Sequence, residues 1–317
     1  MAKERVQLGN TALMVSPVCF GCWQMGQTFW GTVPEEDLVA AVHKALDVGI
    51  NFFDNADAYG DGLAEEILGR ALKGISREKF VVATKACHHW LPERNNQRVP
   101  DLSYDYLVWE CEQSLRRLGL ETIDLYQAHA FEVFTHPEET ARAFEVLKQQ
   151  GKIRYAGCSN YNVEQLRAAL RFGRMDTVQP RYNLLCREAE DELFPFCMAE
   201  GIGVLAFSTL QYGLLTGKFQ GDETFDDLRK THPMFQGEEF KKNVSRINRL
   251  RPIAEANGMT VTQQVIAATL AHPAVTCALV GVKSPKNIEE AAGAMGKSVS
   301  RWDYYQIRKA LTSDVWP

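Results

Sequence analysis

The chain has 317 residues, of which 45% are hydrophobic and 24% are charged. This composition is ordinary for a globular protein, and the length is sufficient for one large domain with a sizeable core. The formal net charge of −5 gives no reason to expect nucleic acid or an anionic membrane as a partner. No apolar run approaches the roughly 20 residues that a membrane helix needs, and the charged residues 1–5 do not resemble a signal peptide.

Eight short apolar runs, separated by polar loops, have the length of buried strands. They lie at residues 18–21, 50–54, 80–85, 123–128, 153–158, 177–179, 203–207 and 276–280. Helical stretches lie between most of these runs, at residues 35–48, 103–117, 137–150, 162–172 and 191–200. This alternation predicts right-handed crossovers and a parallel sheet of the α/β class.

Local signals mark several helix ends. Residues 32–35 read as a capping box, and residues 162–165 open the later helix in the same manner. Gly49 and Gly173 are placed to close these two helices.

The number of strands favours a closed (β/α)8 barrel, or TIM barrel, over an open doubly wound sheet. No strand is followed by a Gly-x-Gly-x-x-Gly phosphate turn, and the chain exceeds a plain barrel of about 250 residues. The surplus is predicted to form an N-terminal hairpin at residues 6–16, a long loop at 210–242 after the seventh strand, and an extra C-terminal helix at 301–312. With no linker or internal repeat, we predict a single domain over residues 1–317.

The eight cysteines lack the density of a disulfide-stapled domain, which favours a reduced, cytoplasmic protein. Cys19 and Cys22 have the spacing of a metal or redox pair, but no second pair exists, so we interpret them as packed thiols. Cys87, His88 and His89 are adjacent, and neighbouring side chains on an extended chain point to opposite sides. We therefore predict no metal site.

Polar and aromatic side chains follow the ends of the predicted strands, where the loops of such a barrel converge on one pocket. These residues are Cys22, Trp23, Asp54, Tyr59, Lys85, His129, Ser159, Asn160, Gln179, Phe207, Ser208, Gly281 and Lys283. Each one alone has an ordinary structural explanation, but their predicted location together at one end of the barrel indicates a functional site.

Four of these residues suit the reduction of a carbonyl group. Hydride transfer to the carbonyl carbon places negative charge on the oxygen, which needs a proton donor. The phenol of Tyr59 is a weak acid, and the ammonium of Lys85 is expected to lower its pKa. Asp54 is expected to position that ammonium, and His129 to orient the substrate oxygen.

Residues 51–60, 124–129 and 157–161 resemble the signature segments of the aldo-keto reductase family, and the resemblance runs from about residue 8 to about residue 295. It implies a catalytic tetrad of Asp54, Tyr59, Lys85 and His129 in an enzyme that reduces aldehydes or ketones with NADPH, or with NADH as the alternative. The same resemblance implies a cofactor site at strand ends and at a clamping loop after the seventh strand. Its members would be Ser159, Asn160, Gln179, Phe207, Ser208, Leu210, Gly213, Lys218, Gly281, Lys283, Ser284, Asn287 and Glu290.

Within that site, Ser159, Asn160 and Gln179 are implied to bind the carboxamide of the nicotinamide, and Phe207 to stack on its ring. Lys283 is implied to hold the ribose 2′-phosphate. The chain departs from the family at Asn287, where members selective for NADP tend to carry arginine. At Ala291 it lacks the usual asparagine that contacts adenine.

Two other functions remain open from the sequence. Potassium-channel β-subunits resemble the family, so a regulatory subunit that senses NADPH is an alternative, although we see no long N-terminal extension. An aldolase with Lys85 as a Schiff-base nucleophile leaves Phe207 unexplained. The substrate pocket is predicted to include Trp23, Tyr59 and His129. The substrate itself and protein partners are not predicted.

Overall fold

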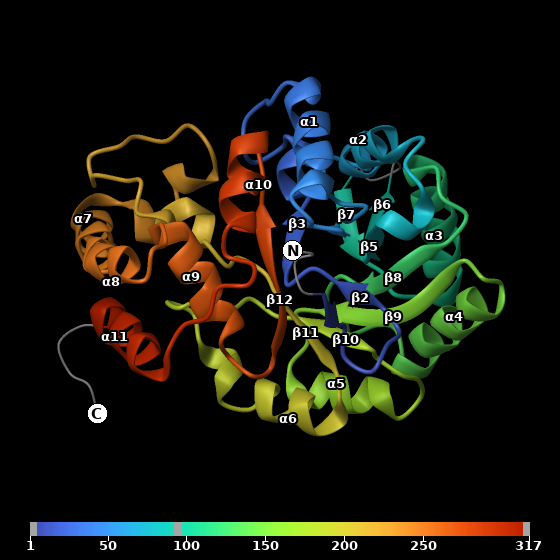
Figure 1. Cartoon of the computed structure of the whole chain (residues 1–317). Helices are drawn as coiled ribbons and strands as arrows, with labels where there is room; N and C mark the ends of the chain where they lie inside the picture. The colour runs from blue at the N-terminus through green and yellow to red at the C-terminus, as the bar shows by residue number, and fades with distance from the viewer. Residues whose placement is uncertain (1–4, 92–96, 313–317) are drawn as a thin grey trace.

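A computed structural model of the chain describes residues 5–91 and 97–312. Eight parallel strands form its centre: β3 (Val18–Gly21), β4 (Phe52–Asp54), β5 (Val81–Ala86), β8 (Ile123–Ala128), β9 (Ile153–Ser159), β10 (Thr177–Gln179), β11 (Gly203–Ala206) and β12 (Val275–Gly281). They close into a barrel in the order β10-β11-β12-β3-β4-β5-β8-β9, with helices packed around it (Figure 1). The predicted (β/α)8 barrel is confirmed, and every predicted strand overlaps one of these eight.

Helices alternate with the strands and cover the outside of the barrel (Figure 1). They are α1 (Glu35–Asp47), α2 (Leu63–Leu72), α3 (Tyr104–Leu118), α4 (Pro137–Gln149), α5 (Val163–Leu170), α6 (Leu193–Glu200), α9 (Val261–Leu270) and α10 (Pro285–Ala292). Each helix buries an apolar face against the strands, and this layer forms the larger core of the molecule.

The inside of the barrel is packed by apolar side chains that alternate along the strands with the outward-facing ones. Cys19, Phe52 and Leu125 belong to this inner cluster, whereas Phe20 and Phe53 belong to the outer one. The N-terminal hairpin, β1 (Val6–Gln7) with β2 (Met14–Val15), adds Leu8, Leu13 and Val15 to the inner cluster. Because the hairpin contacts the beginning of β11, it covers the N-terminal end of the barrel and leaves the C-terminal end for a site.

One predicted cap is wrong and one is confirmed. Helix α1 begins after Pro34 with no side-chain hydrogen bond at its N-cap, so residues 32–35 form no capping box. Asn162 and Gln165 do form the predicted reciprocal capping box of α5. The difference is local: the N-cap is Pro34, which has no side-chain acceptor for the first bond of the box and no backbone N–H to donate the second.

The long segment after β11 is more ordered than its sequence indicates. It contains the short helices η5 (Gln211–Thr216), η6 (Leu228–Lys230) and η7 (Pro233–Phe235), and the predicted loop at 210–242 ends early, where α7 (Gly237–Asn248) begins. With α8 (Arg251–Ala256) and the predicted C-terminal helix α11 (Arg301–Leu311), this segment encloses a second hydrophobic cluster. These elements lie together at the left of Figure 1.

An antiparallel hairpin follows β5, formed by β6 (His88–Leu91) and β7 (Gln97–Pro100). No pattern in the sequence predicts this hairpin, because its two short strands are polar and their side chains are half-buried or exposed. The hairpin lies at the C-terminal end of β5, beside the candidate site.

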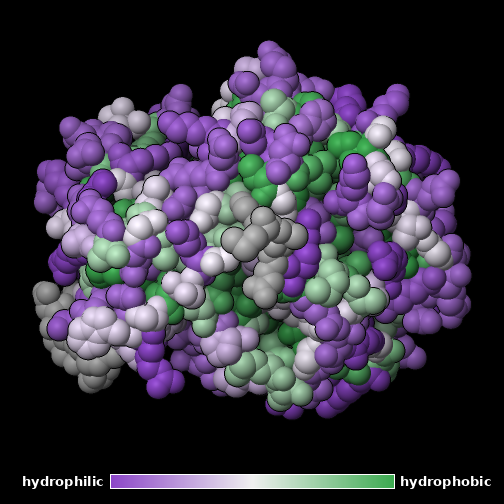
Figure 2. All heavy atoms as spheres, in the orientation of Figure 1, coloured by the Kyte–Doolittle hydropathy of each residue, from purple (hydrophilic) through white to green (hydrophobic). Residues whose placement is uncertain are grey.

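Hydrophilic residues cover most of the face in Figure 2, and hydrophobic ones gather mainly at its centre. Within residues 5–91 and 97–312, no helix has the length and apolar character needed to span a membrane.

Candidate active site

The four predicted catalytic residues meet at the C-terminal ends of neighbouring strands. Asp54 is the last residue of β4, Lys85 lies one residue before the end of β5, and His129 directly follows β8. Tyr59 lies in the turn that joins β4 to α2. Because parallel strands of a closed barrel end on the same face, residues that are distant in sequence converge there.

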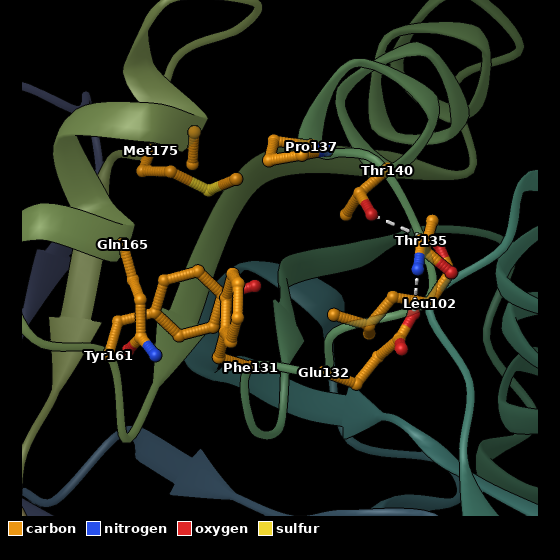
Figure 3. Close-up of a pocket in the computed structure, with 10 residues that line it drawn as sticks. Leu102, Phe131, Glu132, Thr135, Pro137, Thr140, Tyr161, Gln165 and Met175 are labelled. Carbon is orange, nitrogen blue, oxygen red and sulfur yellow. Dashed lines mark hydrogen bonds between the residues drawn. The ribbon is translucent and has the colours of Figure 1, made fainter.

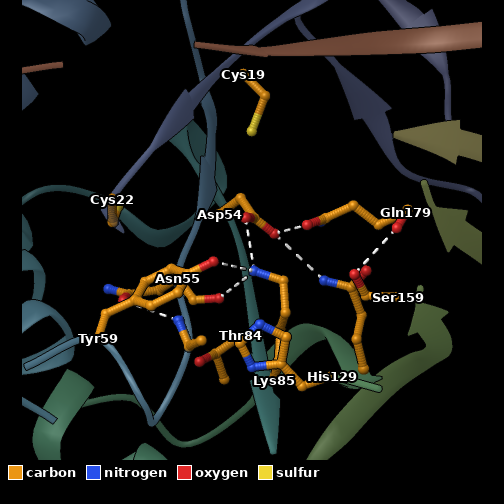
Figure 4. Close-up of polar contacts among 12 residues, drawn as sticks. Cys19, Cys22, Asp54, Asn55, Tyr59, Thr84, Lys85, His129, Ser159 and Gln179 are labelled. Carbon is orange, nitrogen blue, oxygen red and sulfur yellow. Dashed lines mark hydrogen bonds and ion pairs between the residues drawn. The ribbon is translucent and has the colours of Figure 1, made fainter. Parts of the chain in front are cut away.

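Lys85 is the centre of the group (Figure 4). It is fully buried, and its Nζ atom lies 2.7 Å from Oδ2 of Asp54 and 2.7 Å from the backbone oxygen of Asn55. The same atom lies 3.2 Å from the hydroxyl oxygen of Tyr59. An ammonium group has three donors and no acceptor, so Tyr59 must accept this bond. Its own hydroxyl hydrogen is therefore free to be donated elsewhere.

The acidity of Tyr59 differs from the sequence-based expectation. Burial, together with the nearby Asp54 carboxylate, raises the pKa of Tyr59, although the Lys85 ammonium acts in the opposite direction. The net direction is therefore upward, because a buried phenolate loses more hydration than one ammonium restores. At neutral pH the phenol is held in its protonated form, as a proton donor requires.

Asp54 is fixed by amides as well as by Lys85. Its Oδ1 atom accepts hydrogen bonds from Nε2 of Gln179, at 2.8 Å, and from Nε2 of Gln127, at 3.3 Å. Burial alone would lower the pKa of Lys85, but Asp54 and Tyr59 raise it above the ordinary value. The ion pair therefore keeps the ammonium charged inside the barrel mouth.

The ring of His129 lies edge-on to that of Tyr59, with 5.8 Å between the centroids and 80° between the planes. Burial, the Lys85 ammonium and His88 lower the pKa of His129 well below the usual value. The ring is therefore neutral at neutral pH and has one N–H donor. Its Nδ1 atom is buried and has no hydrogen-bond partner within the described part of the chain.

Aromatic rings form one wall beside Tyr59. The ring of Trp23 lies 6.4 Å from that of Tyr59 and 5.3 Å from that of Trp30. Tyr212, from η5, lies 6.3 Å from Trp23 and 5.8 Å from Trp30. Tyr212 was not predicted for the pocket, because the local sequence does not show which side chain of the clamping loop lies against Trp23 and Trp30.

The residues predicted to bind the carboxamide lie together at the ends of β9 and β10. Oγ of Ser159 donates to the backbone oxygen of Gln179 at 3.0 Å, and Nδ2 of Asn160 donates to the backbone oxygen of His129 at 3.0 Å. These bonds attach the end of β9 to both neighbouring strands. Phe207 follows β11 directly and is half-buried.

The segment from Ser208 to Lys218 has unusual backbone geometry. Ser208, Tyr212 and Gly213 have φ angles of 61°, 55° and 86°. Such conformations cost about 1–3 kcal/mol for residues other than glycine and cluster at ligand sites. Leu210 precedes the turn, and a Cβ on Gly213 would lie 3.5 Å from Nζ of Lys218. The loop therefore brings backbone groups and a cation close together.

Three cations gather beyond this loop. Burial and the neighbouring charges of Arg229 and Lys283 lower the pKa of Lys218, and burial and Arg229 lower that of Lys283. Nζ of Lys283 donates to the backbone oxygen of Trp30 at 2.7 Å, and Arg229 lies over the same indole ring. Like charges held this close favour an anionic ligand, which fits the phosphates of a nicotinamide dinucleotide. Arg229 was not predicted as part of this site.

The start of α10 adds to the same region. Gly281 ends β12, and Ser284 is the N-cap of α10 without a side-chain bond to the helix. Oδ1 of Asn287 accepts from the backbone N–H of Lys283 at 3.4 Å. The backbone oxygen of Glu290 accepts from Nε2 of Gln263 at 3.3 Å. A free hydroxyl at a helix N-terminus beside cations also suits a phosphate group.

From the sequence, the loop residues Arg94, Arg98 and Arg229 are the candidates to reach a phosphorylated substrate. Arg98 is paired with Asp61, and Arg229 with Asp227, so both have carboxylate partners. Arg94 lies outside the described residues. The Arg229–Asp227 pair also offsets part of the positive charge of the cation cluster, which leaves Lys218 and Lys283 as the main candidates for an anionic ligand there.

All eight cysteines are free thiols, and burial raises the pKa of both Cys19 and Cys22. In the described part of the chain, no group of three or more histidine, cysteine or acidic side chains could hold a metal ion.

A small pocket elsewhere lies between α4 and α5, lined by Phe131, Glu132 and Tyr161 among others (Figure 3). The carboxylate of Glu132 already accepts from the backbone N–H groups of Phe134 and Thr135. None of the tetrad lines this pocket.

The sequence model of the Aldo/keto reductase family matches residues 17–312. The chain belongs to this family. Aldo-keto reductase YhdN of Bacillus subtilis (strain 168) is 34% identical over 98% of the chain and 95% of its own length. The NADH-specific methylglyoxal reductase of Escherichia coli (strain K12) is 31% identical over 96% of the chain and 98% of its own length.

Solved structures agree with this family membership. The glycerol dehydrogenase AKR11B4 from Gluconobacter oxydans has a TM-score of 0.90 and 35% identity, covering 98% of the chain and 96% of its own. An aldo-keto reductase from Klebsiella pneumoniae, solved in complex with NADPH, has a TM-score of 0.74 and 27% identity, covering 98% and 96%. The protein is therefore an oxidoreductase that reduces carbonyl compounds with a nicotinamide cofactor, NADPH or NADH.

Proposed function

We propose that Tyr59 is the general acid of this carbonyl reductase and that Lys85, Asp54 and His129 support it. The observation that carries the proposal is the bond from Nζ of Lys85 to the hydroxyl oxygen of Tyr59. It leaves the phenolic hydrogen free for the substrate oxygen, and it places a cation next to the phenolate that remains after the transfer.

The bound nicotinamide supplies the hydride that adds to the carbonyl carbon. In our proposal Ser159, Asn160 and Gln179 hold its carboxamide and Phe207 covers one face of its ring. Nε2 of Gln179 donates one hydrogen to Asp54, which orients the amide, and the amide oxygen of Gln179 is the group proposed to accept from the carboxamide.

The remaining cofactor contacts are proposed along the segment after β11 and at α10. Near the pyrophosphate we place Ser208, Leu210, Gly213 and Lys218, and near the adenosine end we place Gly281, Lys283, Ser284, Asn287 and Glu290. The cluster of Lys218, Arg229 and Lys283 supports this assignment, because each cation lies in the field of the others.

His129 is proposed to orient the substrate. Its lowered pKa keeps the ring neutral, so it can donate one hydrogen bond to the carbonyl oxygen without competing with Tyr59 as an acid. Trp23 and Tyr59 line the pocket with it.

The substrate class is proposed to be small carbonyl compounds with oxygen on the adjacent carbon. The names of two relatives support this, since methylglyoxal and glycerol are three-carbon compounds with oxygens on neighbouring carbons. The aromatic wall of Trp23, Trp30 and Tyr212 supports a confined pocket.

The eight free cysteines support a proposed cytoplasmic location, where thiols stay reduced. We also propose that residues 1–317 form one domain, because the second hydrophobic cluster shares Leu210 with the main one.

The test is NADPH consumption by the purified protein with propanal, benzaldehyde, glyceraldehyde and methylglyoxal, in wild type and Tyr59→Phe. Cofactor binding is followed in both proteins by tryptophan fluorescence. We expect wild type to turn over and the variant to bind NADPH while losing about 10²–10⁴-fold in kcat, the usual contribution of a general acid. An active Tyr59→Phe variant would assign the acid to another group. If both proteins bind NADPH and neither turns over, the regulatory function is favoured instead.

A further inference from the structure

His88 lies beside the catalytic histidine although the two belong to different segments. It is the first residue of β6, two positions beyond the end of β5, and its ring centroid lies 5.0 Å from that of His129, with 40° between the planes. The mouth of the barrel therefore contains two imidazoles side by side.

Each of these two imidazoles has one nitrogen that makes no hydrogen bond to the described protein. The Nδ1 atoms of His88 and His129 are both buried and have no hydrogen-bond partner among the described residues. A buried polar atom left without a partner costs about 1–3 kcal/mol, so it indicates a ligand or a bound water. His88 as a residue is only half-buried, so part of it remains accessible to solvent.

His89, the next residue of the hairpin, has a structural role that can be compared with His88. Nδ1 of His89 lies 2.8 Å from Oδ2 of Asp101, and its ring stacks on Tyr106 with centroids 4.5 Å apart. Successive residues of a strand point to opposite sides, so His89 faces the outer helices while His88 faces His129. Of these two hairpin histidines, only His88 has a buried nitrogen without a hydrogen-bond partner among the described residues.

We propose that His88 is a substrate-binding residue that hydrogen-bonds the second oxygen of a carbonyl compound with oxygen on the adjacent carbon. The proposal rests on the function proposed above, in which His129 contacts the carbonyl oxygen. Two oxygens on neighbouring carbons need two polar partners close together, and the adjacent imidazoles provide them.

Burial lowers the pKa of His88, so its ring, like that of His129, is neutral at neutral pH. A neutral imidazole has one donor and one acceptor nitrogen. It can therefore donate to a keto oxygen, as in methylglyoxal, or exchange bonds with a hydroxyl, as in glyceraldehyde. A carbonyl compound without the second oxygen makes no bond to His88, so its binding should not depend on this residue.

The experiment compares kcat/KM for methylglyoxal, glyceraldehyde and propanal, all three-carbon aldehydes, in wild type and His88→Phe. Phenylalanine keeps a planar ring but removes both nitrogens. We expect about a tenfold loss on methylglyoxal and glyceraldehyde, the value of one good hydrogen bond, and a change below about twofold on propanal. Using the ratio of variant to wild type for each substrate cancels the hydration of the aldehydes in water.

Whether KM or kcat changes distinguishes a loss of substrate binding from a loss in the chemical step. A bond to the second oxygen is made in the ground state and in the transition state alike, so the loss should be mainly a rise in KM. His88→Gln, which restores a donor and an acceptor, should recover part of the affinity. His43 on the outer helix α1 is exposed and its Nε2 atom lies 2.8 Å from the backbone oxygen of Ala71, away from the site, so His43→Gln serves as the control.

An equal loss on all three aldehydes, or no loss on any, would overturn the role of His88. If His88→Phe does not fold, as judged by thermal melting, the same ratios are measured with His88→Leu, and the same outcomes decide. Tyr59→Phe is run in parallel: it should lower turnover of all three substrates by about 10²–10⁴-fold. A failure of the general-acid proposal would therefore show in that variant, independently of His88.

Discussion

Gly26 and Gly60 pack backbone against backbone at the mouth of the barrel. A Cβ atom on Gly26 would lie 2.6 Å from the backbone nitrogen of Gly60 and 2.6 Å from the carbonyl carbon of Tyr59. Gly60 also has a φ angle of 62°, in the left-handed region that favours glycine. The loop after β3 therefore packs directly against the backbone of the turn that contains Tyr59, the proposed acid.

Gly26→Ala is expected to displace this turn and to lower kcat by at least tenfold, because a small misplacement of a reacting group has a large effect on the rate. Cofactor affinity should change little, since the cation cluster lies on other segments. Steady-state kinetics and a fluorescence titration with NADPH measure the two effects. Gly74→Ala is the control, because nothing lies within 4 Å of a Cβ there; its positive φ, which Gly26 does not share, should cost stability without displacing the site. Unchanged kcat in Gly26→Ala would show that the contact does not position Tyr59.

Lys85→Met should destabilise the protein as well as inactivate it. The variant leaves the Asp54 carboxylate buried without its cation, and breaking a buried ion pair in this way costs about 3–5 kcal/mol. Urea unfolding measures the change. The double variant Asp54→Asn with Lys85→Met removes both charges, so it should recover much of the stability and none of the activity. A single variant as stable as wild type would contradict the importance of this pair for the fold.

Lys283→Ala is expected to weaken NADPH binding by about tenfold or more and NADH binding by less than about twofold, the difference corresponding to one ion pair with a phosphate. The measurement is a fluorescence titration with each cofactor at two ionic strengths. The matched control is Lys286→Ala, three positions along in the first turn of α10, where the side chain is exposed. An equal loss for both cofactors would refute a role for Lys283 at the 2′-phosphate.

Acidification should destabilise the protein in part through His129. Its pKa is lowered in the folded state, whereas in the unfolded chain it is near 6.5. Between these two values the unfolded chain binds the proton and the folded protein does not, so the free energy of unfolding decreases as pH falls below about 6.5. From pH 7.5 to 5.5, wild type should lose about 1 kcal/mol more than His129→Gln, measured by urea unfolding. Equal losses would indicate that this ring is not held neutral.

Local patterns in the sequence were sufficient for the barrel. The runs at 18–21, 123–128 and 177–179 coincide with β3, β8 and β10, and the capping box at Asn162 is present as predicted. Apolar periodicity and caps depend on residues within a few positions of one another, so they can be read without knowing the fold. The strand ends also identified Asp54, Tyr59, Lys85 and His129 as candidates for one mouth.

Other features depended on which segments the closed barrel brings together. Three such contacts join residues that are about 30 to 200 positions apart in the sequence. They are Arg229 of the long loop with Trp30, Gly26 with Gly60, and His88 with His129. The direction of the Tyr59 pKa also needed the structure, because Lys85 and burial act in opposite directions and only the packing shows which is larger. The sequence determined the elements and the types of side chain at the site. Their distances and the strength of their electrostatic coupling were decided by tertiary packing, because both depend on contacts between residues that no local pattern relates.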